Sequence, residues 1–387
     1  MKKKIAILGS TGSIGKTLIN IIKKDKKNFE LILLSADENY KELLKQAKNF
    51  KVQNLIITNV KSFNKLKKSK LPKNINIYND FSNFRKIFKK RIDYTMCSIS
   101  GIQGLKPTIE IIRYTKTLAI ANKEAIVCGW HLIEKSLNKH KTKFIPVDSE
   151  HFSIWYALQG IEKNLIEKIY LTASGGPFLE NSLKKLNKVN IKQVTNHPNW
   201  KMGKKISTDS ATMINKVFEV IEAKKIFSIN YNKLSIIIHP KSYVHAIIRF
   251  KNGLTKIVVH DTSMEIPILN SLYSSKKIIK SNDLDFKILN NLDFREVNLK
   301  KFPLVKILKT LPEKPSLFET ILVSINDKFV ELFLNNKIKF TDISKKMNKM
   351  LKLNNLKKYK KIKPKKIEEI IRMNTKVKNY IEKFIQK

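Results

Sequence analysis

Short apolar runs alternate with amphipathic segments over the first 148 residues. Residues 4–8 are mostly apolar, a glycine-rich turn covers residues 9–15, and a second apolar run spans residues 29–35. Short apolar runs bounded by turns predict buried strands, and the amphipathic stretches between them predict helices. Such alternation is typical of a doubly wound parallel sheet, so we predict an α/β fold with a Rossmann-like domain over residues 1–148.

The pattern changes after residue 148. Residues 149–275 contain apolar runs such as Leu234–Ile238 beside an amphipathic helical stretch at 211–226, which predicts an α+β domain. Residues 276–312 are expected to be a connecting segment. From residue 313 to the end, apolar residues recur at helical spacing among many lysines, so we expect a C-terminal helical domain over 313–387.

Length and apolar content limit the possible classes of protein. The chain has 387 residues, 42% of them hydrophobic, which suits two or three globular domains. No apolar run approaches the roughly 18 residues that a membrane span needs. The apolar stretch after the basic start ends at Gly9, too early for a secretory signal. Cys97 and Cys128 are the two cysteines, so we expect no disulfide framework and a cytoplasmic location.

The formal net charge of +45 raises the possibility of nucleic-acid binding. Only six of the 77 basic residues are arginines, whereas proteins that read nucleic acid favour arginine for bidentate contacts. The lysines are also spread along the whole chain. We therefore interpret the charge as a solvated surface, and we expect neither nucleic acid nor a membrane as a partner.

A glycine motif follows the first predicted strand directly. Gly9, Gly12 and Gly15 give the spacing G-x-x-G-x-x-G, close to the fingerprint of dinucleotide-binding proteins. Glycines let the backbone approach a pyrophosphate, and the helix that follows favours negative charge at its N-terminus. The alternative is a plain turn between a strand and a helix. The position of the motif favours a dinucleotide cofactor.

Two carboxylates follow the apolar stretch that ends the first domain. Asp148 and Glu150 are two residues apart, and in an extended chain such residues point to the same side. Two convergent carboxylates are suitable ligands for a hard divalent cation such as Mg²⁺ or Mn²⁺. The alternative is a solvated acidic turn, although acids are scarce here, at 32 against 77 basic residues.

The predicted helix at 211–226 carries a second group of polar residues. Asp209 and Ser210 are suitable caps for it. At 100° per residue, Asn215, Lys216 and Glu219 occupy one arc beside the apolar stripe. An amide, an ammonium and a carboxylate on one arc suit a site that binds phosphate and metal together, and the alternative is an ordinary solvated face. The preceding segment, 197–206, is expected to be a mobile flap.

Several smaller features each allow a functional and a structural interpretation. Ser174 lies in a tight loop after a predicted strand, where its hydroxyl can donate to a phosphate or simply complete a turn. Residues 122–124 follow another strand, at the end where doubly wound sheets bind ligands. His239 and His245 are more simply explained as buried or turn histidines than as ligands. Cys97 and Cys128 are expected in the core.

Seven motifs, taken together and in order, resemble one enzyme family, the 1-deoxy-D-xylulose 5-phosphate reductoisomerases. The resemblance covers nearly the whole chain and is weakest between residues 40 and 90 and in the C-terminal tail. The motifs are GSTGSIG (9–15), GIQGLKPT (101–108), ANKEAIV (121–127), PVDSEH (146–151), LTASGGPF (171–178), HPNWKMGKKISTDSATMINK (197–216) and IHPKSYVHAIIRF (238–250).

The resemblance implies an NADPH-dependent enzyme that rearranges and reduces 1-deoxy-D-xylulose 5-phosphate to 2-C-methyl-D-erythritol 4-phosphate in isoprenoid precursor synthesis. It implies a homodimer and a catalytic Mg²⁺ or Mn²⁺ held by Asp148, Glu150 and Glu219, with Lys123 as a further catalytic residue. It places the sugar-phosphate substrate on Lys123, Ser149, Glu150, Ser174, His197, Trp200, Ser210, Asn215, Lys216 and Glu219. It places NADPH on Thr11, Gly12, Ser13, Ile14, Asn39, Asn122, Glu124 and Gly203.

Two stretches depart from the family pattern. Asp37 and Glu38 stand where the family usually has a sequence such as Gly-Lys, which affects the expected preference for NADPH. Asn326 and Asp327 lie where a stretch like N-A-A-N-E is common, which affects either packing or a dimer contact. The alternative enzyme is a simple nicotinamide dehydrogenase, but hydride transfer alone requires neither three metal-binding acids nor a phosphate site.

Overall fold

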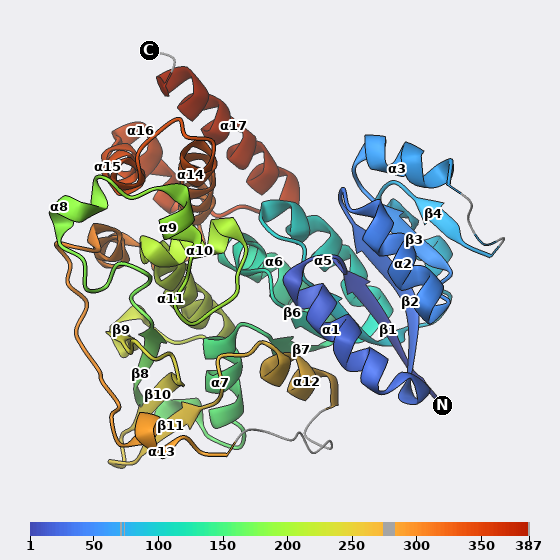
Figure 1. Ribbon diagram of the computed structural model, residues 1–387, viewed down its shortest axis with the longest axis horizontal. Coiled ribbons are helices and arrows are strands. Elements are labelled where there is room, and N and C mark those ends of the chain that lie inside the picture. The colour runs from blue at the N-terminus through green and yellow to red at the C-terminus, as the bar shows by residue number, and fades with distance from the viewer. Residues whose placement is uncertain (70–71, 73, 274–282, 386–387) are drawn as a thin grey trace. The chain divides into compact units, whose positions relative to one another are not determined.

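The computed structural model describes residues 1–69, 72, 74–273 and 283–385 (Figure 1). The chain divides into two compact units, each considered by itself below. Unit 1 comprises residues 1–125, 131–148 and the described part of 264–279, and unit 2 comprises residues 126–130, 149–263 and the described part of 280–387.

Unit 1 is built on a seven-stranded parallel sheet in the order β4-β3-β2-β1-β5-β6-β7. The strands are β1 (Lys3–Leu8), β2 (Phe29–Ala36), β3 (Asn54–Ile57), β4 (Asn76–Tyr78), β5 (Ile92–Cys97), β6 (Thr115–Ile120) and β7 (Lys143–Pro146). The direction of winding reverses between β1 and β5, which is where sheets of this type bind ligands. The predicted doubly wound parallel sheet is confirmed.

Helices connect the strands of unit 1. They are α1 (Ser13–Lys24), α2 (Tyr40–Phe50), α3 (Val60–Lys67), α4 (Phe84–Ile87), α5 (Leu105–Ile111) and α6 (Lys123–His140), of which residues 126–130 belong to unit 2. A further helix of unit 1, α12 (Glu265–Tyr273), comes later in the chain, after the last strand of unit 2. Apolar side chains from β1, β2, α1, α2 and α12 form one buried core, in which Ile7, Leu18 and Leu34 are fully buried. The loops at the carboxyl edge of the sheet therefore start from strands that are packed into this core.

Unit 2 contains a four-stranded mixed sheet in the order β11-β10-β8-β9, with β8 and β9 parallel and the other pairs antiparallel. The strands are β8 (Ile166–Ala173), β9 (Leu234–Ile238), β10 (Val244–Phe250) and β11 (Thr255–Val259). Its core joins the sheet to α7 (Ser149–Ala157) and α11 (Ile214–Phe227) through residues such as Ile154, Val220 and Ile248. The predicted α+β character is confirmed.

The remaining helices of unit 2 include a helical C-terminal region, as predicted from the apolar spacing. They are α8 (Leu183–Leu186), α9 (Ile191–Thr195), α10 (Lys204–Ala211), α13 (Phe286–Leu289), α14 (Leu317–Leu334), α15 (Phe340–Leu351), α16 (Asn354–Lys357) and α17 (Ile367–Ile385). Ser316 and Glu319 form a buried capping box at the start of α14. The hydroxyl of Ser324 and the side chain of Asn374, 2.8 Å apart, tie α14 to α17.

The predicted connecting segment, 276–312, is only partly described, because residues 276–282 lie outside the described residues. Its described part contains α13 and the 3-10 helix Pro303–Thr310. The domain boundaries proposed from the sequence remain a prediction. Within the described part of the chain, no helix combines the length and apolar character needed to cross a membrane.

Candidate active site

The glycine-rich loop of unit 1 begins at the carboxyl end of β1. Gly9 has a φ of 90°, and a Cβ atom on Gly15 would lie 2.3 Å from the carbonyl oxygen of Gly9. Both positions therefore require glycine. Gly12 caps α1 without a side-chain hydrogen bond, and the first turn of α1 has no acidic residue. A bound pyrophosphate fits this helix end, where backbone N–H groups favour negative charge.

The predicted cofactor contacts in this loop are accessible. Of three others in unit 1, Asn39 and Asn122 make hydrogen bonds within the fold, and Glu124 is buried. Thr11, Gly12, Ser13 and Ile14 are exposed or half-buried. The Asn39 side chain caps α2 by accepting the Glu42 N–H at 3.2 Å. The buried Asn122 amide accepts the Ala125 N–H and donates to the carbonyl of Gly101, both at 2.8 Å. The side chain of Glu124 is also buried.

The two acidic residues that depart from the family pattern follow the carboxyl end of β2. Asp37 and Glu38 are both exposed. The carboxylate of Asp37 accepts a hydrogen bond of 2.6 Å from the hydroxyl of Thr58, which follows β3. The Asp37 side chain is therefore directed towards the neighbouring strand end.

A second feature of unit 1 is an ion pair between neighbouring strand ends. Lys123 follows β6 and Asp148 follows β7, and the Lys123 ammonium lies 2.9 Å from the Asp148 carboxylate. Their side chains are only 7% and 17% exposed, so water screens this attraction less than at an open surface. The sheet thus brings together two residues that the sequence assigned to catalysis.

The three acids predicted to hold a metal lie close together. Asp148, Glu150 and Glu219 each present a carboxylate oxygen, and these oxygens all lie within 4.8 Å of one another. The expected extended conformation is wrong, because Ser149–Ala157 is helical and Glu150 lies in the first turn of α7. The start of this helix brings Glu150 back towards Asp148, so the carboxylates converge by a different backbone route.

Buried polar partners surround the carboxylates of unit 2. The Lys216 ammonium contacts Glu150 at 2.5 Å and also contacts Glu219. The Asn215 amide donates to Glu219, and the Ser149 hydroxyl donates to Glu150 at 2.6 Å. Lys216 and Glu219 are 4% and 1% exposed, so the polar arc of α11 is no solvated face. A positive ammonium among these oxygens shows that they favour a cation.

Burial and charge act in opposite directions on Lys216. Burial lowers the pKa of its ammonium, but the negative charges of Glu150 and Glu219 outweigh that effect and raise the pKa above its ordinary value. Lys216 therefore stays protonated at neutral pH.

Ser174 and His197 form a second polar group in unit 2, on a loop that lies beside the backbone of Ser210. The His197 Nδ1 atom accepts the backbone N–H groups of Asn199 and Trp200 at 3.2 and 3.1 Å. The ring proton must then be on Nε2, which donates to the Ser174 hydroxyl at 3.0 Å. That hydroxyl also accepts the N–H of Gly176 at 3.1 Å.

These bonds leave the Ser174 hydroxyl proton as a donor, since its oxygen already accepts two hydrogen bonds. A Cβ atom on Gly176 would lie 3.1 Å from the carbonyl oxygen of Ser210, so the Ser174 loop packs on the end of α10. Burial lowers the pKa of His197 to about 4, which agrees with a neutral ring. The group can bind an anion through neutral donors.

The predicted flap, 197–206, is coil up to Gly203, and α10 begins at Lys204. The Trp200 ring makes an edge contact with the buried His245, 6.0 Å between ring centroids. Gly203, a predicted cofactor contact, is exposed and caps α10. His239 and His245 are buried, as expected.

The predicted capping role of Asp209 and Ser210 is wrong. Both lie inside α10, and α11 begins after Met213, whose left-handed φ of 62° separates the two helices. The buried Asp209 carboxylate instead accepts the side-chain amide of Asn326 at 2.8 Å. Asn326 therefore has a packing role within the chain, joining α14 to the helix that carries Ser210.

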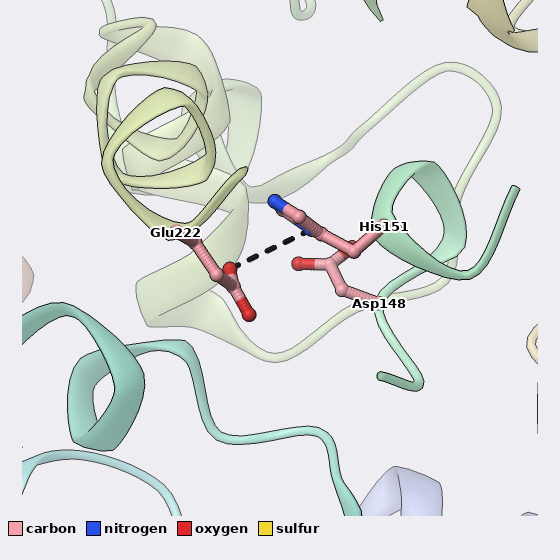
Figure 2. Close-up of side chains that lie close together, drawn as sticks. All are labelled: Asp148, His151 and Glu222. Atoms are coloured by element: carbon pink, nitrogen blue, oxygen red, sulfur yellow. Dashed lines mark ion pairs between the residues drawn. The ribbon is translucent and has the colours of Figure 1, made fainter. Parts of the chain in front are cut away.

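One polar pair was missed in the sequence. His151 and Glu222 are both buried, with the His151 Nδ1 atom 3.6 Å from the Glu222 carboxylate (Figure 2). Helical spacing could have identified Glu222 from the sequence, because Glu222 is three residues after Glu219 and lies 60° from it around α11. A buried glutamate on the arc of Asn215 and Glu219 belongs with the same polar group.

Comparison with known proteins now identifies the family. Three family models match: 1-deoxy-D-xylulose 5-phosphate reductoisomerase over residues 5–129, its C-terminal domain over residues 144–227, and the DXP reductoisomerase C-terminal domain over residues 260–380. A relative of the same name from Pelagibacter ubique (strain HTCC1062) is 57% identical over 377 residues, which cover 96% of this chain and 97% of the relative. The chain belongs to the 1-deoxy-D-xylulose 5-phosphate reductoisomerase family.

Other members of the reductoisomerase family agree in sequence and fold. The enzyme from Clostridium kluyveri is 37% identical, over 98% of both chains. The Zymomonas mobilis enzyme, solved in complex with NADPH, matches with a TM-score of 0.87 at 29% identity, over 100% of this chain and 99% of that one. A reductoisomerase solved with NADPH, fosmidomycin and magnesium matches with a TM-score of 0.91 at 29% identity, over 99% and 98% of the two chains. The family predicted from the motifs is confirmed.

Proposed function

We propose that this protein is an NADPH-dependent reductoisomerase that converts 1-deoxy-D-xylulose 5-phosphate to 2-C-methyl-D-erythritol 4-phosphate in isoprenoid precursor synthesis. Family membership supports the reaction. The structural observation that carries it is the convergence of the carboxylates of Asp148, Glu150 and Glu219, the last two of which contact the buried Lys216 ammonium. A dehydrogenase that only transfers hydride has no need of such a group.

We assign Asp148, Glu150 and Glu219 as the ligands of Mg²⁺ or Mn²⁺. Their donor set is all carboxylate oxygen, which suits hard divalent cations. Relatives solved with magnesium support the metal. Bound there, the ion would supply a Lewis acid that polarises the carbonyl and hydroxyl oxygens of the substrate. Lys216 and Asn215 hold the carboxylates in place and supply further donors to the substrate.

We assign the neutral group of Ser174, His197 and Ser210, with Asn215 and Lys216, to the substrate phosphate. The Ser174 hydroxyl offers a proton whose direction is fixed by two accepted hydrogen bonds. Lys123 and Ser149 are assigned to further substrate oxygens. Trp200 and the segment from His197 to Ile206 would cover the bound substrate and exclude water.

We place NADPH on the glycine-rich loop of unit 1, where it would supply the hydride. The N-terminus of α1 and the required glycines support the pyrophosphate position. The relative solved with NADPH supports the choice of cofactor. Asn39 and Asn122 would serve by holding α2 and the loop before α6, because hydrogen bonds within unit 1 already engage their side-chain amides.

Product identification tests the reaction. Purified protein with NADPH, 1-deoxy-D-xylulose 5-phosphate and Mg²⁺ should yield the branched polyol phosphate, and excess EDTA should abolish turnover until Mg²⁺ or Mn²⁺ is restored. A linear reduced product would show a simple dehydrogenase. Full activity in excess EDTA would contradict the metal assignment.

Inhibitor binding tests the phosphate position. Fosmidomycin joins a phosphonate to a metal-binding hydroxamate, so one molecule should engage both polar groups of unit 2. We expect Ser210→Ala and Asn215→Ala each to weaken its binding by about 1–3 kcal/mol, the cost of a lost charge-assisted hydrogen bond. Calorimetry would measure this, with Thr341→Ala, which removes a half-buried hydroxyl bonded to Asn187 and not assigned to the site, as a control. Unchanged affinity in the Ser210/Asn215 double variant would rule out the phosphate placement.

We also propose a cytoplasmic homodimer. Cys97 and Cys128 are buried free thiols, consistent with a reducing compartment. In unit 2, β11 is an edge strand, and Leu254 and Ile257 in and beside it are 65% and 48% exposed. Apolar residues on an open edge suit pairing with a second copy of the chain. Light scattering of the wild type and of Ile257→Lys would test this, since the variant should shift towards monomer.

A further inference from the structure

The helices that carry Glu150 and Glu219 are joined by a buried histidine. His151 directly follows Glu150 on α7, and its Nε2 atom lies 2.9 Å from the backbone carbonyl oxygen of Glu219 on α11. A carbonyl oxygen can only accept, so Nε2 carries a proton and donates it. This hydrogen bond links the backbone of one proposed metal ligand to the neighbour of another.

Glu222 lies on the other side of the same imidazole ring. Its carboxylate is 3.6 Å from the His151 Nδ1 atom, and the close-up shows the two side chains facing each other (Figure 2). His151 is fully buried and Glu222 is 1% exposed. The ring also stacks on Phe227, with planes 10° apart. A buried carboxylate on one edge and an aromatic face together restrict the ring to one orientation.

We propose that Glu222 is a positioning residue that acts through His151, holding the backbone of Glu219 at a fixed place relative to Glu150. The contacts run from the Glu222 carboxylate through the His151 ring to the Glu219 backbone, and we call this series the brace. Glu222 is one helical turn after Glu219, so the brace begins and ends on α11 and passes through His151 on α7. Metal-binding carboxylates must be spaced to match the ion, and groups that orient such ligands strongly affect affinity. The proposal rests on the metal site assigned above.

The experiment is a double-mutant cycle on Mn²⁺ affinity, measured by calorimetry on the full-length protein without substrate. Loss of an orienting partner typically weakens metal binding by about 10–100-fold. We expect that range for Glu222→Gln and for His151→Leu. Because Glu222 acts through His151, the double variant should bind no more weakly than His151→Leu alone. Additive losses would overturn the proposal.

A second readout separates positioning from a general loss of structure. In Glu222→Gln, kcat at saturating Mn²⁺ should recover to within about threefold of wild type, while the Mn²⁺ concentration for half-maximal rate rises. The matched control is Ile221→Val, a small change to a fully buried neighbour on α11, which should leave Mn²⁺ affinity unchanged. If Glu222→Gln does not fold, Glu222→Asp replaces it in the same double-mutant cycle. Aspartate keeps the negative charge, but its side chain is one methylene shorter.

Glu219→Gln distinguishes failure of this inference from failure of the proposed function. If Glu219→Gln binds Mn²⁺ as the wild type does, the metal assignment itself is wrong. If Glu219→Gln loses affinity and Glu222→Gln keeps it, only the positioning role is wrong. Asp148, His151 and Glu222 also present donor atoms within 4.8 Å of one another. Two Mn²⁺ ions per chain, the second lost in His151→Leu, would make His151 a ligand and overturn the brace.

Discussion

The glycine-rich loop of unit 1 and the carboxylate group of unit 2 are built from different parts of the chain. The loop depends on backbone, with Gly9 at a φ of 90° and Gly15 in contact with the Gly9 carbonyl. The carboxylate group depends on buried side-chain charge, with Lys216 between Glu150 and Glu219. Each arrangement suits the ligand proposed for it, a long pyrophosphate in one case and a compact cation in the other.

The contrast shows which changes each region tolerates. The conformation of a backbone-built loop is sensitive to added volume, and nearby side-chain charges affect the ligand more than the loop itself. A group of buried charges is sensitive to the loss of one member, because a charge left without its counter-charge in a buried position is costly. Substitutions that change only volume, only protonation or only surface charge should therefore affect the two regions differently.

The largest effect is expected from added volume in the loop. In Gly15→Ala, the new Cβ would lie 2.3 Å from the Gly9 carbonyl oxygen and 2.5 Å from the Ser10 Cα, both backbone atoms. Neither can move without shifting β1 or α1, so we expect a destabilisation of about 3 kcal/mol and loss of NADPH binding. Thermal unfolding and NADPH fluorescence titration would measure both.

Gly12→Ala is the matched control. A Cβ atom there would meet only the Gly9 carbonyl oxygen, at an ordinary 3.6 Å. We expect a loss of stability below about 1 kcal/mol, that of a less favourable helix cap. Equal destabilisation by the two substitutions would show that close backbone packing is not what fixes this loop.

The same contrast explains how far the sequence alone could lead. In unit 1 the first strands, the glycine loop and the doubly wound parallel character of the sheet follow from apolar runs and spacing, which are local properties, whereas the order of the strands comes only from the structure. For the carboxylate group, the sequence identified the acidic residues but not their backbone conformation, because a D-x-E pair is equally compatible with an extended strand and with the start of a helix. The real conformation depends on Ser149–Ala157 packing as α7 against the sheet, a tertiary effect.

The helix break at Met213 was also beyond the sequence. The sequence predicts a helix over residues 211–226 that includes Met213, and no glycine or proline nearby marks Met213 as left-handed. Tertiary contacts such as the bond from Asn326 to Asp209 supply the reason, since they fix α10 independently of α11. The family resemblance identified the site residues without this information, because motifs indicate which residues occupy a site and not which backbone conformation brings them there.

A smaller effect is expected from acid on the neutral group of unit 2. The folded-state pKa of His197, about 4, lies below the ordinary value of 6.5, so the unfolded chain takes up a proton first as pH falls. The stability from this residue is present above pH 6.5 and is lost as pH falls towards 4. The shift sets a limit of about 3 kcal/mol, and we expect about 1–2 kcal/mol after solvent relaxation.

Unfolding by urea from pH 7.5 to pH 5 would test this in wild type and His197→Gln. The stability advantage of the wild type should shrink as pH falls, since glutamine does not titrate. Ser174→Ala removes the hydrogen-bond partner but no titrating group, so its difference from wild type should stay nearly constant. A wild-type advantage over His197→Gln that is independent of pH would contradict a neutral, low-pKa ring.

The smallest effect concerns surface charge beside the backbone-built loop. An acid at the end of the second strand commonly accepts hydrogen bonds from the 2′-hydroxyl of NAD, and Asp37 occupies that place. The 2′-phosphate of NADPH would meet Asp37 and Glu38, a repulsion of roughly 4 kcal/mol at 4 Å before screening. The Asp37 carboxylate, hydrogen-bonded to the Thr58 hydroxyl, is exposed and directed towards the neighbouring strand end, so we expect a net cost of about 1 kcal/mol.

NADPH should therefore be used with weak discrimination against NADH. The double variant Asp37→Gly/Glu38→Lys should raise the ratio of kcat/KM for NADPH to kcat/KM for NADH. Glu30→Lys, at the opposite end of β2, adds the same charge as Glu38→Lys and should leave the ratio unchanged. A strong NADPH preference in wild type that the double variant does not alter would show that these acids do not face the adenosine ribose.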